Sequence, residues 1–369
     1  MLHERMNAEA AYLFGHSLLQ QAAYDLLLPT ERSTLHHHAF QLLDQPGAEP
    51  DSLVAHAMAL AADPARDFDA AASRVLGKAA VAAARRYDQR RVLELGVMLR
   101  RLARPDPKAE FELRQRYAYA LKTLGDTDAC RRELAQAANL AEQLDSNLMR
   151  IRVGRMLAEL AADAGQAEKA EADLLRLLPL ADTLAEPQQK ISLLGNIAIM
   201  RDLQDRRDSA EAAYNEALQL AREAGLRAEQ MVLIGNLGRL YFDSGRADAA
   251  RRMYETALAM SIELDDARYR SFWEGWIAAD DRRRGRLAQA RERMQQAIRL
   301  ARQVGDYMVE LNWRVDLAMM DAEEGRHADA ARQLEGAVAG ALSAGALSHA
   351  QKWRGQLDEI LARQRKPGG

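Results

Sequence analysis

A forty-residue period runs through most of this 369-residue sequence and restricts its fold more than any other feature. Residues that interrupt helices recur at this interval, at Gly125, Gly165, Asp205, Gly245, Gly285 and Gly325. A small residue follows each of them by five positions, at Cys130, Ala170, Ala210, Ala250, Ala290 and Ala330. A large one follows by nine, at Leu134, Leu174, Tyr214, Tyr254, Met294 and Leu334. Several columns in register indicate a structural repeat rather than chance alanine richness.

The composition indicates that each repeat is a pair of helices. Charged residues make up 28% and aromatics only 5% of the chain, and no window alternates β-branched or aromatic residues with polar ones, as strands do. Glycine or aspartate provides the tight turn between the helices, and the small residues let the two backbones approach. Because each pair leaves an apolar face uncovered, the pairs must stack. We therefore expect an all-α solenoid.

The stretch "IGNLGRLYFDSGRADAARRMYETALAM", residues 234–260, resembles the tetratricopeptide repeat. The usual repeat of that family has about 34 residues, and the longer repeat here is similar to those of kinesin light chains and of many bacterial signalling ATPases. The resemblance implies a right-handed superhelix with a concave groove. Six repeats cover residues 106–345, and Leu347 to Arg365 reads as the capping helix that a solenoid end needs, within a terminal region 346–369.

The first hundred residues do not follow the period. The string "YLFGHSLLQQAAYDLLLPTERSTLHHHAFQLLD", residues 12–44, resembles a segment of bacterial signal-transduction ATPases with numerous domains, where it ends a winged-helix-like domain. We expect one helix from Ala8 to Leu28 and a second from Thr30 to Leu43. Residues 1–45 then form this remnant, and residues 46–105 form a helical connector and a degenerate repeat with its turn at Tyr87-Asp88.

The nucleotide-binding module of those ATPases is missing from this sequence. Its only Gly-Lys pair, Gly77-Lys78, is followed by Ala79 and lies in a helical stretch rather than after a strand. We therefore expect no ATP binding by that route and no cofactor. The chain is either a fragment or the product of a gene whose ATPase module is encoded elsewhere.

Charge and cysteine content exclude further classes. The formal net charge is −3, which gives no general attraction to nucleic acid or anionic lipid. No apolar run approaches the roughly 18 residues of a membrane helix. The single cysteine, Cys130, excludes an internal disulfide and fits a reducing cytoplasm. These features predict a cytoplasmic protein that binds neither nucleic acid nor membrane.

Catalytic and metal-binding patterns are not found. His36, His37 and His38 point in different directions on a helix, so we expect His36 to pack and its neighbours to be solvated. Cys130 occupies a small-residue column and reads as a buried packing thiol. Mixed-charge runs such as residues 280–284 read as solvated faces. We therefore expect neither an enzyme nor a metal site.

The first helix of each repeat is expected to line the groove. The candidate partner-binding residues on these helices are Arg116, Tyr119, Arg152, Arg155, Asn196, Asn236, Arg239, Phe272, Trp276 and Asp316. Asn196 and Asn236 match the asparagine with which peptide-binding members of the family hold the ligand main chain. The basic clamp that binds a terminal carboxylate elsewhere in the family is not reproduced as a set.

Two features leave alternatives open. Gly195, Gly235 and Gly275 recur at the same register, either to admit a neighbouring helix or to admit a ligand backbone. Aromatic residues gather between Tyr269 and Trp276, either as core or, at Phe272 and Trp276, as an anchor for a partner.

These features favour a non-enzymatic scaffold or sensor arm of a signalling ATPase system, which holds a protein or peptide in its groove. The ATPase itself would be a separate or upstream module. The alternative is a regulator that senses a small molecule or signalling peptide, with an output domain elsewhere. The sequence names neither the partner, the pathway nor the oligomeric state.

Overall fold

The computed structural model describes residues 24–43, 50–62, 70–85, 88–102 and 106–365 of the chain. Every regular element in these ranges is a helix, and they contain no strand. The first helices are α3 (Pro29–Leu43), α4 (Pro50–Ala62), α5 (Ala70–Arg85) and α6 (Gln89–Leu102). The repeats contain α7 (Pro107–Leu124), α8 (Thr127–Gln143), α9 (Asn147–Asp163), α10 (Ala167–Ala181), α11 (Gln188–Leu203), α12 (Arg207–Glu223), α13 (Arg227–Asp243), α14 (Ala247–Glu263), α15 (Ala267–Arg283), α16 (Leu287–Gln303), α17 (Tyr307–Glu323) and α18 (His327–Ala344), and α19 (Leu347–Arg365) follows them.

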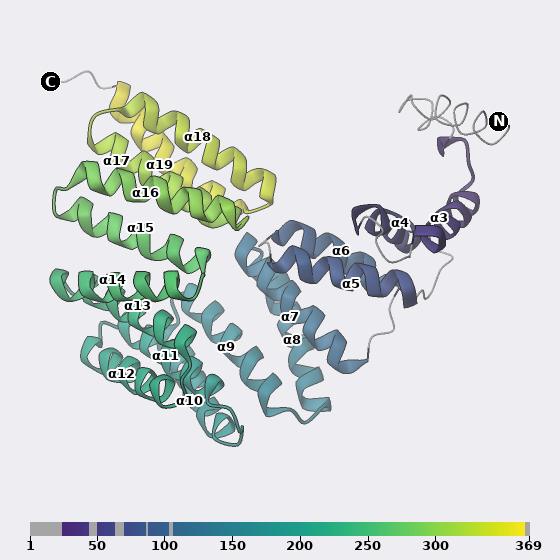
Figure 1. The fold of residues 1–369 in the computed structure, drawn as a ribbon, viewed down its shortest axis with the longest axis horizontal. Helices are drawn as coiled ribbons and strands as arrows, with labels where there is room; N and C mark the ends of the chain where they lie inside the picture. Colours follow the sequence, from purple (N-terminus) through teal and green to yellow (C-terminus); the bar gives the residue numbers. More distant parts are fainter. Residues whose placement is uncertain (1–23, 44–49, 63–69, 86–87, 103–105, 366–369) are drawn as a thin grey trace. The chain divides into compact units, whose positions relative to one another are not determined.

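The chain divides into two units. The first comprises residues 1–82 and 91–105, and the second comprises residues 83–90 and 106–369. In the second unit, consecutive helices pack as antiparallel pairs from α7 to α18, and each pair contacts the next (Figure 1). The odd-numbered helices α9, α11, α13 and α15 also contact one another directly, so they form one layer of the solenoid. The expected all-α solenoid is confirmed.

Positive φ angles mark the turns that the period predicted. The five glycines of the first breaker column have φ between 74° and 84°, and Asp205 takes the same left-handed conformation with φ of 56°. Asp145 and Asp265, between repeats, also have positive φ angles of 45° and 52°. Glycine adopts this conformation without strain, and aspartate tolerates it better than most residues. Ala185 does not adopt it, because α10 ends early at Ala181.

The repeat columns form the core of the second unit. All six residues of the small column, from Cys130 to Ala330, are 0% exposed, and the large column from Leu134 to Leu334 is buried as well. Cys130 donates its thiol proton to the carbonyl of Ala118 in the preceding helix, at a sulfur–oxygen distance of 3.1 Å. The expected packing role of Cys130 is confirmed.

In the first unit, α3 begins at Pro29, one residue before the expected start. The helix expected from Ala8 lies largely outside the described residues. His36 packs between Tyr24 and His56, with its two ring nitrogens 2.8 Å from the Tyr24 hydroxyl and from His56 Nδ1. Helices α5 and α6 lie on either side of the turn expected in the degenerate repeat, and Tyr87 in that turn is outside the described residues.

Helix α19 closes the C-terminal end of the second unit. It buries Trp353, Leu357 and Ile360, and it packs against α18. Its first turn also contacts α7, where Ser348 lies directly against Gly125. No helix in the described ranges is both long and apolar enough to cross a membrane.

Candidate functional site

Two cavities lie along the layer of first helices in the second unit. The N-terminal cavity has a volume of about 350 Å³ and is lined mainly from α7 and α9, by residues that include Arg116, Tyr119, Arg152, Arg155, Met156 and Glu159. The central cavity has a volume of about 320 Å³ and is lined by α9, α11, α13 and α15, through residues that include Arg155, Ser192, Asn196, Val232, Asn236 and Tyr269. Arg155 lines both cavities, so the two are neighbours along one surface, which we call the groove.

Asn196 and Asn236 occupy the same position in successive repeats and reach the same cavity. The Nδ2 atom of Asn196 is buried and has no hydrogen-bond partner. Buried amides in proteins are nearly always hydrogen-bonded, so an unpaired one in a cavity wall is a donor available to a ligand. The structure thus brings together the two asparagines that the sequence singled out.

The arginines expected in the groove differ in whether they have acidic partners. Both terminal nitrogens of Arg152 donate to Glu112, at 2.6 and 3.0 Å, and these hydrogen bonds lower the pKa of Glu112. Arg239 lies 3.8 Å from Asp202 and 3.7 Å from Asp243. Arg152 and Arg239 therefore have their charge compensated within the protein.

Arg155 and Arg116 are the exceptions. Neither forms an ion pair with an acidic residue in the described part of the chain, and Nε of Arg155 is buried without an acceptor. Burial lowers the pKa of the Arg155 guanidinium, and the charge of Glu159, one turn further along α9, opposes this shift. The residue is only partly buried, so its unpaired Nε is a hydrogen-bond donor available to an acceptor supplied from outside.

Two expected groove aromatics pack into the helix layers and line neither cavity. The Trp276 ring is stacked on Tyr254 with centroids 6.0 Å apart, and it meets the edge of Phe242 at 5.9 Å. Phe272 packs edge-on against Trp313, with centroids 6.2 Å apart. The aromatic wall of the central cavity is Tyr269 instead. Tyr269 belongs to the same aromatic cluster in the sequence, but the pattern alone did not fix which ring faces the groove.

The structure decides between the two roles of the recurring glycines. A methyl group at Gly235 would overlap the Trp273 ring of the next repeat, and one at Gly275 would come within 2.6 Å of the Trp313 ring. At Gly195 the neighbour is Leu233, at 3.3 Å. Gly235 and Gly275 make room for large side chains of the following repeat, so they serve helix packing, whereas Gly195 also lines the central cavity.

Asp316 lies on α17, outside both cavities, and forms no ion pair or hydrogen bond with any residue that the structure describes. Burial raises the pKa of its carboxyl to about 6, although the charges of Arg282 and Lys352 oppose this shift. At pH 7 this carboxyl is mostly ionised at a cost in stability, and a cation supplied by a ligand would offset that cost.

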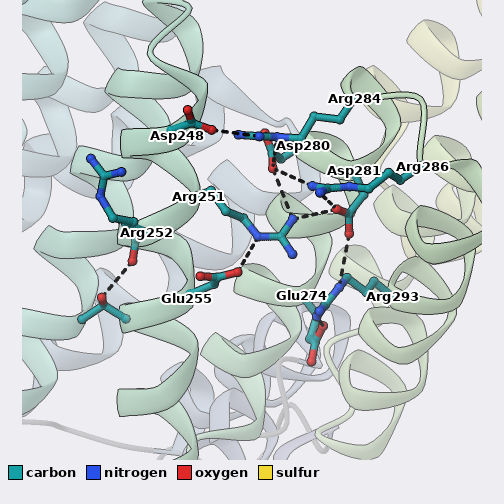
Figure 2. Close-up of polar contacts among 11 residues, drawn as sticks. Asp248, Arg251, Arg252, Glu255, Glu274, Asp280, Asp281, Arg284, Arg286 and Arg293 are labelled. Atoms are coloured by element: carbon teal, nitrogen blue, oxygen red, sulfur yellow. Dashed lines mark hydrogen bonds and ion pairs between the residues drawn. The ribbon is translucent and has the colours of Figure 1, made fainter.

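The mixed-charge run at residues 280–284 is solvated only at Arg283 and Arg284, and the burial of its two aspartates corrects the expectation from sequence. Asp280 and Asp281 are each 1% exposed. Figure 2 shows arginines of α14, of α16 and of the turn between α15 and α16 converging on them. The arginine–carboxylate contacts are those of Arg251 at 2.7 Å and Arg286 at 2.7 Å to Asp281, Arg293 at 3.3 Å to Asp281, and Arg284 at 2.9 Å to Asp280. The ion pairs with these arginines offset the cost of removing the two carboxylates from water, and the sequence pattern alone did not indicate these partners.

Among the described residues, no three histidine, cysteine, aspartate or glutamate side chains are placed to hold a metal ion. Burial raises the pKa of the Cys130 thiol to about 11, which keeps it protonated and unreactive at neutral pH. The groove instead presents amide and guanidinium donors beside apolar walls.

Comparison with known proteins agrees with this architecture. The sequence model of the tetratricopeptide repeat matches residues 189–263, which lie within the α-solenoid of the second unit. Comparison with curated protein sequences gives no significant match.

Three similar solved structures illustrate the fold. A Rap protein complexed with competence and sporulation factor is 13% identical, over 91% of this chain and 93% of that one, with a TM-score of 0.56. The Rap conjugation gene regulator of the plasmid pLS20, in complex with a Phr peptide, is 13% identical over 90% and 92%, with a TM-score of 0.56. A signal-transduction ATPase with numerous domains and a tetratricopeptide repeat sensor, from Pyrococcus horikoshii, is 15% identical over 84% of this chain and 46% of that one, with a TM-score of 0.48.

Proposed function

We propose that this chain is a non-enzymatic sensor that binds a peptide, or a peptide segment of a protein, in the groove of its second unit. The observation that carries the proposal is a set of donors without acceptors in one cavity wall, the Nδ2 of Asn196 and the Nε of Arg155, beside Asn236. An extended peptide offers main-chain carbonyls at regular intervals, and a carboxamide both donates to a carbonyl and accepts from an amide. Two structures of similar fold hold a regulatory factor or peptide, which supports the same class of ligand.

We further propose that this sensor serves a signalling ATPase that is carried on a separate or upstream module. The N-terminal resemblance to the ATPases with numerous domains supports this role, and so does the missing Gly-Lys-Ser/Thr motif at Gly77-Lys78. Calorimetric titration of the chain with ATP is expected to give no heat of binding. A saturable heat would contradict the separate-module proposal.

The groove proposal is tested by removing the two asparagines. Asn196→Ala with Asn236→Ala should lose captured partners from a lysate of the source cells, because each lost hydrogen bond costs about 0.5–1.5 kcal/mol and more if a buried group is stranded. Asn139→Ala with Asn215→Ala is the matched control, since both residues are exposed on the second helices α8 and α12. Thermal melts check folding. A double variant that melts normally and retains every partner would contradict the proposal.

A compact small molecule is the second candidate. The central cavity, at about 320 Å³, lies at the lower end of the range for small-ligand sites. Mass spectrometry of material released from the purified protein by denaturation separates the candidates. A peptide supports the first, and a non-peptide compound that is lost with Asn196→Ala supports the second.

A further inference from the structure

A glycine and a tryptophan fill the junctions between first helices in the later repeats. Gly235 on α13 faces the Trp273 ring of α15. Gly275 on α15 faces the Trp313 ring of α17 in the same way. In both pairs the ring lies so close that a methyl group on the glycine would overlap it. The glycine and the tryptophan of the next helix therefore form one packing unit that recurs with the repeat.

The junction between α11 and α13 departs from this pattern. Here the glycine is Gly195, and Leu233 takes the place of the tryptophan. A leucine has no ring, and its Cδ2 atom is 3.3 Å from the position of a methyl group on Gly195. Both residues line the central cavity, whereas Gly235 and Gly275 line neither cavity. The central cavity, about 320 Å³ in volume, thus lies where the following repeats hold a tryptophan ring.

The walls of the central cavity suit a ring as well. Ile191, Val232 and the ring of Tyr269 contribute apolar surface, which a bound ring would remove from water. One repeat later, Tyr269 stacks on Trp273, with centroids 6.0 Å apart and planes 16° apart. Glu229 takes the place of Tyr269 in the repeat of Leu233, and its carboxylate is an acceptor for a ring N–H such as that of an indole.

We propose that the central cavity is a subsite for a planar aromatic ring of indole size, which the ligand supplies in place of the tryptophan that this repeat lacks. This inference rests on the proposed function and specifies what the groove selects. The ring belongs to an aromatic side chain of the bound peptide or to a compact aromatic molecule. Both present the same flat apolar face to Gly195, Leu233 and Tyr269.

Four probes test the subsite and identify the source of the ring. Three are fluorescein-labelled, amidated nonapeptides of glycine and serine that differ only in a central tryptophan, leucine or alanine, and the fourth is free indole. Fluorescence anisotropy is expected to show the tryptophan peptide binding about tenfold or more tightly than the alanine peptide, with the leucine peptide between them, because the ring buries the most apolar surface. A saturable heat from indole in calorimetry, without any preference among the peptides, would instead assign the ring to a compact molecule.

Leu233→Trp supplies the ring from the protein itself. The variant places tryptophan opposite a glycine, as the next two repeats do, so it should melt at or above the wild-type temperature. It should bind the tryptophan and alanine peptides with affinities within about twofold of each other and give no heat with indole. Leu175→Trp, on the exposed side of α10, makes the same chemical change outside both cavities and should keep the wild-type preference. Ser192→Phe fills the cavity from α11 and provides the same test if Leu233→Trp does not fold.

Three outcomes would overturn the inference. They are no binding of any probe, equal affinities for the three peptides together with no heat from indole, and a preference for the ring that survives in a folded cavity-filling variant. The failure of the subsite differs from the failure of the groove function. If the alanine peptide binds as well as the tryptophan peptide and is lost with Asn196→Ala and Asn236→Ala, the groove function stands and the ring subsite is rejected.

Discussion

Gly235 lies inside a helix, where glycine is unfavourable, because its packing against the next repeat leaves no room for a larger residue. A glycine inside a helix is less favourable than alanine by about 1 kcal/mol, so Gly235→Ala would stabilise an isolated helix. In this protein the added methyl overlaps the Trp273 ring. We expect a net loss of about 1–3 kcal/mol in the free energy of unfolding, measured with urea.

Gly336→Ala is the matched control, because Gly336 is exposed within α18 and has no atom within 4 Å of an added methyl. That variant should gain roughly 0.5–1 kcal/mol. Stabilisation by both substitutions would show that Trp273 does not occupy the space over Gly235.

Asp316 gives a second prediction at this scale, with a defined pH dependence. Its folded pKa is raised to about 6 by burial, so the native state holds this proton more tightly than the unfolded chain does. The ionised carboxylate therefore costs stability at pH 7, and the cost disappears as the pH falls through about 6 towards 4. Asp316→Asn should stabilise the protein by up to about 3 kcal/mol at pH 7 and much less near pH 4.

Urea unfolding at several pH values measures this difference. Asp358→Asn, on the exposed side of α19, serves as the control and should change stability little at any pH. An effect of Asp316→Asn that is constant with pH would mean that Asp316 is not held in its protonated form by burial.

At the scale of helices, the small-residue column sets how closely the two helices of a repeat approach. Ala250 is 0% exposed at the start of α14, where a larger side chain has no free space. Ala250→Leu is expected to overpack the helix pair and lower the free energy of unfolding by about 1–3 kcal/mol. Ala290→Leu in α16 should behave in the same way, since Ala290 is also 0% exposed.

The control lies in the same helix as Ala250. Ala259 is exposed on α14, so Ala259→Leu should change stability by less than about 0.5 kcal/mol in the same denaturation experiment. Equal losses at Ala250 and Ala259 would refute the register on which the repeat assignment rests.

At the scale of the whole second unit, ion pairs that recur with the repeat link neighbouring helix pairs. Glu171 on α10 binds Arg201 on α11 at 2.9 Å, and Arg291 on α16 binds Asp321 on α17 at 2.7 Å. At the first junction the acidic residue lies on the earlier helix, and at the second junction it lies on the later helix. A shifted alignment of repeats would therefore bring like charges together, which favours the observed order.

The junction around Asp281 has the most buried carboxylate of these, 1% exposed, and three arginines contact it (Figure 2). Asp281→Asn removes a buried anion from three arginines that are themselves partly exposed, and we expect a loss of about 1–3 kcal/mol in the free energy of unfolding. Asp248→Asn is the control, since Asp248 pairs with Arg284 but its side chain is 82% exposed. It should cost less than about 1 kcal/mol.

Hydrogen exchange should show that the damage is local. In a solenoid each repeat interacts with its neighbours, so Asp281→Asn should lower protection mainly in α14, α15 and α16. Uniform loss of protection across the second unit would show instead that the unit unfolds as one cooperative block.

The sequence by itself determined the helix pairs, their turns and the residues between them. A period of forty residues in several columns fixes the distance between equivalent turns, and only glycine and aspartate column members adopt positive φ in the structure. These properties depend on local backbone sterics and on the size of side chains at fixed spacing, which a linear pattern records. The same pattern placed Asn196 and Asn236 on one face.

Only the tertiary structure decided how side chains from different repeats meet. Trp276 packs on Tyr254, Trp273 fills the space over Gly235, and Tyr269 faces the cavity, although all three rings belong to one helix. It also decided that Arg152 donates to the carboxylate of Glu112 while the Nε of Arg155 is left without an acceptor. The reason is that the contacts of each ring and each charge depend on side chains of neighbouring repeats. Which side chains meet is set by the rotation of each helix about its own axis, and a sequence pattern does not record that rotation.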